Sequence, residues 1–396
     1  MLKAADALAE AGCDVRVVST HHLGWAAETD RELARTRGWR WTVVDYDRHT
    51  APATWLWSGV RTRLARTAAH ILGEGARVPV GLAAAANIRA HGELTRAAAA
   101  EPADLIYGGS SGGLLPAALA ARRLGIPFVL DLEDFHSAEQ NAPADRWRDR
   151  MSERVETTVL PAAAALTTSS RAMAAAYAVK YGVRATVIHN TFELAAEPPD
   201  PSAVSRRGLK LYWFGQTIGG GRGLEDAVRA MGLAGVPGEL HLRGRLDTRY
   251  FETLRHLARG VAPSLRLVHH LPASPEAMVE LCRPYDIGLS GDEPTSVSRE
   301  LAVCNKALTY PLAGLAVVLS STSGTAELRS DLGDGALAYV PGDVEALAAG
   351  FARWALDRTS LVASRAAAFA AAQRRWHWRH PAERDALVAT VCGALL

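Results

Sequence analysis

The second half of the chain alternates short apolar runs with helical patterns, and this alternation limits the fold more than any other feature. Six strand-like runs follow residue 200, at residues 209–214, 239–243, 265–269, 286–289, 315–319 and 336–340. The segments between them repeat apolar residues at helical spacing, as in residues 250–257 and 344–354. Short apolar strands separated by helices predict a parallel, doubly wound α/β sheet.

The first half alternates in the same way, though less regularly. Strands are expected at residues 15–19, 41–44, 104–107, 128–131, 165–167 and 186–188. The proline-rich segment 197–206 predicts a linker. We therefore predict two Rossmann-like domains, residues 1–195 and residues 207–372, with ligands bound in a cleft between the carboxyl ends of their strands.

The N-terminal segment departs from the usual order of such a domain. An α/β domain usually opens with a strand, whereas residues 2–9 have the pattern of a helix. We expect either a first domain that lacks its first strand or a start that is placed downstream of it.

Composition excludes several classes of protein. The net charge of +2 is too small to indicate a nucleic-acid-binding protein. No apolar run reaches the ~18 residues that a membrane span needs, although a peripheral membrane contact is compatible with the sequence. The four cysteines are scattered without CxxC spacing, which favours a reduced, metal-free, cytoplasmic chain.

One glycine-rich turn predicts a binding site for an anion. Five glycines lie within residues 215–223, between the strand-like run 209–214 and a helical pattern that begins at Leu224. Glycines allow the backbone to come close to a ligand, and the free N–H groups and dipole at a helix N-terminus favour negative charge. Arg222 adds a cation to the turn, so we expect a phosphate or diphosphate there.

Several motifs, in order along the chain, resemble those of retaining, nucleotide-sugar-dependent glycosyltransferases of family 4 type. They are VIHNTFE at residues 187–193, FGQ at 214–216 with RGL at 222–224, NKALTYPLAG at 305–314, SGTAEL at 323–328 with PGD at 341–343, DLEDFH at 131–136, and Trp378 with Glu383. The resemblance implies the GT-B fold, with a C-terminal helix over residues 377–396 that packs back on the first domain. It also implies a nucleotide sugar as co-substrate, without a metal or another cofactor.

The resemblance also implies roles for residues of the second domain. Arg222 and Lys306 would contact the donor diphosphate, near the backbone of Gly215 and Gln216. The resemblance implies that five further residues contact the donor nucleoside and sugar: Asn305, Thr309, Tyr310, Glu300 and Arg243.

The chain departs from the family pattern at three of these positions. Thr309 stands where the family has the glutamate that binds the ribose, Gln216 where it has an arginine, and Arg222 where it has a lysine. Glu300 is either a substitute for that glutamate or a solvated loop carboxylate.

In the first domain, Glu133, Asp134 and His136 follow a predicted strand and are expected to face the donor sugar. A carboxylate or imidazole there suits stabilisation of an oxocarbenium-like state and orientation of hydroxyls. Asp134 aligns with the family aspartate, and Glu133 occupies a family arginine position. The acceptor side is expected to include four residues: Ser110, Ser111, His21 and His22.

Two further motifs in this domain have less specific interpretations. Residues 108–112 match GxSxG, the nucleophile motif of hydrolases, but also suit a loop that lines the cleft. Asp45-Tyr46-Asp47 is a DxD sequence that we interpret as an acidic strand end.

Two alternatives to a glycosyltransferase stay open: a GT-B-fold nucleotide-sugar epimerase, and a catalytically degenerate binding subunit. The sequence leaves the donor base, the sugar and the acceptor undetermined; the acceptor classes considered are a polysaccharide, a lipid and a small natural product.

Overall fold

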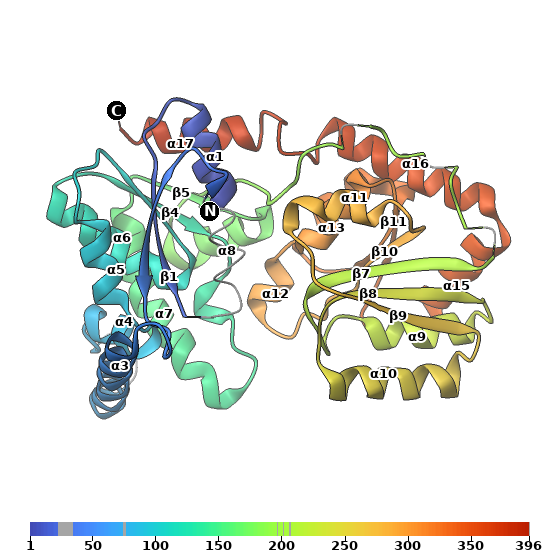
Figure 1. Ribbon diagram of the computed structural model, residues 1–396, viewed down its shortest axis with the longest axis horizontal. Helices are drawn as coiled ribbons and strands as arrows, with labels where there is room; N and C mark the ends of the chain where they lie inside the picture. The colour runs from blue at the N-terminus through green and yellow to red at the C-terminus, as the bar shows by residue number, and fades with distance from the viewer. Residues whose placement is uncertain (23–34, 74–76, 196, 201, 206, 396) are drawn as a thin grey trace. The chain divides into compact units, whose positions relative to one another are not determined.

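The computed structural model describes residues 1–22, 35–73, 77–195, 197–200, 202–205 and 207–395 (Figure 1). The chain divides into two compact units, one of Met1–Ile188 with Arg384–Leu396 and one of His189–Glu383. The first division point precedes the proline-rich segment 197–206, because His189 is hydrogen-bonded to Glu383 within the second unit.

The second unit contains a six-stranded parallel sheet in the order β12-β11-β10-β7-β8-β9. Its strands are β7 (Leu209–Ile218), β8 (Gly238–Leu246), β9 (Leu265–His270), β10 (Ile287–Ser290), β11 (Ala316–Ser320) and β12 (Ala336–Tyr339). From β7 the chain first adds strands on one side and then, with β10, adds them on the other. This reversal is the topological switch point of a doubly wound sheet.

Helices cover both faces of this sheet (Figure 1). One face packs against α9 (Leu224–Leu233), α10 (Thr248–Val261) and α15 (Val344–Leu356). The other packs against α11 (Met278–Cys282), α13 (Asn305–Leu312), α14 (Ala326–Leu332) and α16 (Arg358–Arg374), and α12 (Val297–Leu301) lies in the loop after β10. The first four residues of β11 are apolar because alternate side chains enter the two cores, Ala316 and Val318 on one side and Val317 and Leu319 on the other.

The first unit divides its strands between two parallel sheets. A two-stranded sheet joins β1 (Arg16–His21) to β2 (Arg40–Asp45). A four-stranded sheet has the order β3-β4-β5-β6, with β3 (Ile106–Gly109), β4 (Phe128–Leu132), β5 (Ala165–Thr168) and β6 (Thr186–Val187). Among the described residues, no strand is hydrogen-bonded between β1 and β3.

The helices of the first unit are α1 (Leu2–Glu10), α3 (Pro52–Leu72), α4 (Val80–Asn87), α5 (His91–Ala98), α6 (Ser110–Leu124), α7 (Arg146–Val159), α8 (Arg171–Tyr181) and α17 (Arg384–Gly393). Helix α17 packs on α1, β5 and β6. It begins at Arg384 and not at residue 377, where the sequence predicts its start, because residues 376–383 form turns. Within the described ranges, none of the helices combines the length and apolar character that crossing a membrane requires.

Candidate functional site

The turns that follow β7 and β10 meet at the switch point of the second unit. Strand β7 continues through Gly215 to Ile218, past the end predicted at residue 214, with an irregularity in its pairing between Phe214 and Thr217. The glycine turn is therefore shorter than expected. A Cβ on Gly223 would lie 2.4 Å from the carbonyl oxygen of Gly291, so only glycine permits this approach between the two turns.

The glycine turn leads directly into the N-terminus of α9. Gly221 and Gly223 adopt left-handed backbone angles, with φ of 71° and 69°. Such angles are costly for residues with a Cβ. The turn therefore needs glycines at these positions for its own conformation as well as for access to the helix N-terminus.

Arg222 and Lys306, which are far apart in the sequence, converge on one carboxylate. Arg222 donates from Nη1 to Oδ1 of Asp292 at 2.9 Å, and Nζ of Lys306 lies 3.3 Å from Oδ2 of Asp292. Lys306 is buried in the first turn of α13, and its Nζ lies 5.5 Å from the ring centroid of Trp213. The structure thus brings together the two cations that were predicted to bind the diphosphate.

Asp292 is the residue of this site that the sequence analysis missed. Burial alone would raise the pKa of its carboxyl, but the charges of Lys306 and Arg222 and the hydrogen bond from Arg222 lower it overall. Asp292 is therefore ionised at neutral pH, and the group of two cations and one anion keeps one net positive charge. An acidic residue two positions after the strand at the switch point was the available signal, but in the sequence it is one of several polar residues in a loop.

Two other residues that were predicted to contact the donor are buried in the core of the second unit. Thr309 and Tyr310 are fully buried, with their hydroxyls donating to the carbonyl oxygens of Asn305 and Leu289. Tyr310 packs directly under Gly288 in the core. Neither side chain presents a surface to a ligand in this structure.

The remaining residues that were predicted to contact the donor form hydrogen bonds within the second unit. Asn305 accepts a hydrogen bond from Asn190, and Glu300 accepts two from the backbone N–H and hydroxyl of Ser323. Arg243 donates to the hydroxyl of Tyr212 and to the carbonyl oxygen of Leu271. Gln216 is exposed on β7 and follows Gly215, whose Cα lies against the ring of Trp213.

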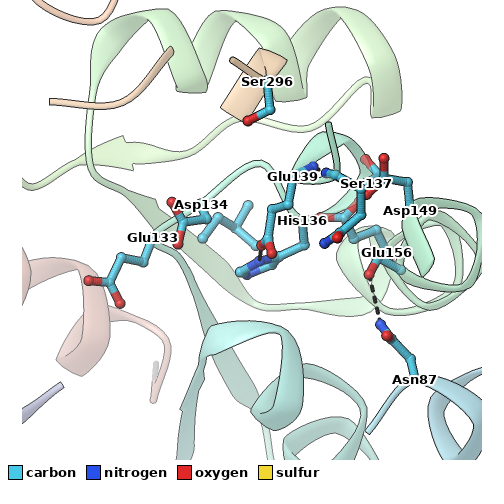
Figure 2. A network of polar contacts seen from close by, with 12 residues as sticks. Asn87, Glu133, Asp134, His136, Ser137, Glu139, Asp149, Glu156 and Ser296 are labelled. Atoms are coloured by element: carbon cyan, nitrogen blue, oxygen red, sulfur yellow. Dashed lines mark hydrogen bonds and ion pairs between the residues drawn. The ribbon is translucent and has the colours of Figure 1, made fainter. Parts of the chain in front are cut away.

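In the first unit, the predicted catalytic residues lie after the carboxyl end of β4, in different environments (Figure 2). Glu133 and Asp134 are exposed, whereas the side chain of His136 is buried. Figure 2 shows the carboxylate of Glu133 pointing away from His136. Desolvation by surrounding protein atoms and the charge of Asp131 raise the pKa of Glu133.

His136 is held by a carboxylate on one side only. Its Nδ1 lies 2.5 Å from Oε1 of Glu139, while its buried Nε2 has no hydrogen-bond partner among the described residues. Burial alone would lower the pKa of His136, but the hydrogen bond and charge of Glu139, with the charges of Glu156 and Asp134, raise it overall. The imidazolium form of His136 is therefore more stable than that of a free histidine, and in that form its Nε2 carries an N–H without an acceptor among the described residues.

A small cavity lies next to His136 and is also lined by Ser111 and Gly112 from the start of α6. The volume open to a water molecule is about 10 Å³, which is near the minimum for one bound water. The structure thus brings one residue predicted on the acceptor side, Ser111, together with His136. Ser110 is exposed with a φ of 61°, and among the described residues no histidine is hydrogen-bonded to it.

His21 and His22 lie at the end of β1, in the other sheet of this unit. Nδ1 of His21 lies 3.4 Å from Oδ1 of Asp45, and the ring of His22 stacks on Tyr46 at 5.0 Å. Asp45 also accepts from the backbone of Asp47, so the DxD sequence forms a strand-end turn. Among the described residues, no group of three or more His, Cys, Asp or Glu side chains is arranged to hold a metal ion.

The raised pKa of His136 predicts a pH-dependent contribution to stability. A group whose pKa is raised by folding stabilises the fold fully below its unfolded pKa of about 6.5 and loses that contribution as pH rises through the folded pKa. We expect the melting temperature of His136→Gln to fall below wild type most at about pH 6, and by less as pH rises above about 6.5 through the folded pKa. Melting curves of both proteins across this range test it; a difference that is constant with pH would contradict it.

Comparison with known proteins gives a consistent family and fold. Residues 1–191 match the model of the glycosyl transferase 4-like domain. HepE of Anabaena, solved with UDP-glucose, is 15% identical with a TM-score of 0.64, over 96% of this chain and 99% of that one. Sucrose-phosphate synthase of Thermosynechococcus elongatus is 13% identical with a TM-score of 0.63, over 96% and 97%. Among proteins with curated functions, none matches this sequence.

The family model covers slightly less than half of the chain, the part that carries β1 to β6, and the structural similarities extend over both units. The predicted relationship to family 4 type glycosyltransferases and the predicted GT-B fold are confirmed. The chain is therefore a glycosyltransferase of the GT-B fold, and its residues 1–191 match the glycosyl transferase 4-like domain family.

Proposed function

We propose that this protein transfers a sugar from a nucleoside-diphosphate sugar to an acceptor, with retention of the anomeric configuration and without a metal ion. The observation that carries the proposal is the convergence of Arg222 and Lys306 on Asp292 at the switch point of the second unit. Ligands of open α/β sheets bind at this position. The UDP and UDP-glucose bound in HepE make UDP the first nucleotide to test.

The chemistry of the site suits a diphosphate leaving group. Breaking the bond between the sugar and the diphosphate places negative charge on the phosphate oxygens. Fixed donors next to that charge stabilise the transition state without reorganisation. The candidates are Arg222, Lys306 and the N–H groups at the N-terminus of α9, and they would stabilise this charge in place of a metal ion.

Asp292 would weaken the binding of a diphosphate at the same site. Its carboxylate is paired with the two cations and would repel an incoming diphosphate. We expect Asp292→Asn to bind UDP more tightly by about 1–3 kcal/mol, the scale of one hydrogen bond to a charged group. Isothermal titration with UDP measures this change, and weaker binding by the variant would instead assign Asp292 a positive role in holding the ligand.

Asp134 is the proposed catalytic carboxylate of the first unit. It is exposed after β4, where it can orient a sugar hydroxyl or stabilise positive charge on the sugar ring. We expect Asp134→Asn to lower turnover by about 100-fold while UDP affinity stays within about twofold of wild type. Equal losses of turnover and affinity, or no loss of either, would count against this role; Asp145→Asn is the matched control, at a partly exposed carboxylate of the same unit.

Two measurements separate this function from its rivals. A melting-shift panel of UDP, GDP, ADP and dTDP with their sugars identifies the donor nucleotide. Product analysis with the matching nucleotide sugar then distinguishes transfer to an acceptor, an epimerised donor, and no turnover. Only the first outcome, with the anomeric configuration kept, supports the proposal.

A further inference from the structure

Helix α3 exposes its large apolar side chains and buries its small ones. Trp57, Leu64 and Ile71 are 65%, 66% and 77% exposed. They recur every seven residues, or about two helical turns, and so form one stripe along the helix. Leu56, which is 55% exposed, borders the stripe.

The opposite face of α3 is the one that packs against the protein. Its buried residues are Ser58, Thr62, Ala65 and Ala69, and the neighbouring element is α4. A helix whose only role were to cover a core would place tryptophan, leucine and isoleucine on the buried face. The stripe of Trp57, Leu64 and Ile71 is therefore available for a partner outside the fold.

Charge on and around α3 indicates what kind of partner this is. The helix contains no aspartate or glutamate, and Arg61 and Arg63 lie on the two sides of Leu64 around the helix axis. Arg61 is paired with Glu93, whereas Arg63 is exposed. Two further arginines lie at this helix: Arg66 donates to the carbonyl oxygen of Ala86, and Arg89 donates to that of Trp55.

We propose that α3 is an interfacial helix that lies on a lipid bilayer carrying anionic headgroups. Aromatic and aliphatic side chains on one face of a helix, with arginines flanking them, are the features by which such helices bind. Tryptophan favours the boundary between headgroups and acyl chains, and anionic headgroups attract the arginines. A second copy of this chain would instead bring arginines against arginines. Figure 1 shows α3 at the outer edge of its unit.

Co-sedimentation of the full chain with vesicles tests this surface. The vesicles consist of phosphatidylcholine alone or of phosphatidylcholine mixed with phosphatidylglycerol. We expect binding to the mixed vesicles to exceed binding to the neutral ones by at least about tenfold and to weaken with added salt. The double variant Trp57→Glu/Leu64→Glu should lose at least about tenfold in binding to the mixed vesicles.

The matched control is Val179→Glu, because Val179 on α8 of the same unit is 89% exposed and lies on a different helix. It should bind as wild type does. Unchanged melting temperatures and unchanged UDP-induced melting shifts in both variants separate this test from the donor site. Wild-type protein that does not sediment with the mixed vesicles, or a double variant that binds like wild type, would overturn the proposal. The proposal would also be overturned if sedimentation velocity showed a dimer for wild type and a monomer for the double variant, because the stripe would then be a contact between copies.

Discussion

Replacing Glu383 with alanine is expected to destabilise the second unit by about 3 kcal/mol, the scale for removing one partner of a buried charged network. Glu383 is fully buried and accepts from the backbone N–H of His189 at 2.6 Å. Its other carboxylate oxygen lies 2.9 Å from Nδ1 of His189 and is paired with Arg375. The alanine variant leaves a buried N–H without an acceptor and Arg375 without its partner.

Chemical denaturation of wild type and variant measures this effect. Glu383→Gln keeps an acceptor for the amide of His189 and should lose less than the alanine variant. Glu345→Ala, on the exposed surface of α15, is the matched control and should change stability by about 0.5 kcal/mol or less. If Glu383→Ala changed stability no more than this control, the contacts of Glu383 would not be stabilising.

Replacing Lys306 with alanine is expected to weaken UDP binding by about 1–3 kcal/mol, the scale of hydrogen bonds to charged groups. Lys306 is buried next to Asp292 and Trp213, so its ammonium group is held in place before a ligand arrives. Its removal also leaves Asp292 with Arg222 as the remaining cation of the group. The variant should therefore lose the UDP-induced melting shift and also melt at a lower temperature without ligand.

A control and a second variant separate these two effects. Arg229→Ala removes an exposed cation from α9 and should leave UDP binding unchanged. Lys306→Ala/Asp292→Asn removes the unbalanced carboxylate, so it should recover stability without recovering wild-type affinity. Wild-type affinity in Lys306→Ala would remove this residue from the donor site.

The regular alternation after residue 200 made the second unit predictable, because its short runs form a parallel sheet whose strands β10 and β11 are buried on both faces. The glycine turn was also found from local pattern, although β7 extends beyond its predicted end to Ile218. Backbone pattern did not reveal that irregular pairing allows a strand to continue through Gly215.

Side-chain partners were less accessible to prediction, since they depend on contacts between distant segments. Arg222 and Lys306 were expected near one ligand only through the family resemblance, and Asp292 between them was not expected. Tyr310 and Thr309 were assigned from motif position, but helix α13 turns both into the core. The exposed stripe of α3 also escaped notice, because a sequence does not show which face of a helix packs against the protein.

Calorimetric titration with UDP and with uridine, on wild type and on Arg222→Ala/Lys306→Ala, tests the proposed donor site most directly. We predict that wild type binds UDP more tightly than uridine by at least about 2 kcal/mol, since only UDP carries a negatively charged diphosphate for the two cations to bind. The double variant should lose most of that preference. Equal binding of UDP and uridine by wild type, or a double variant that keeps the preference for UDP, would contradict a diphosphate site at Arg222 and Lys306.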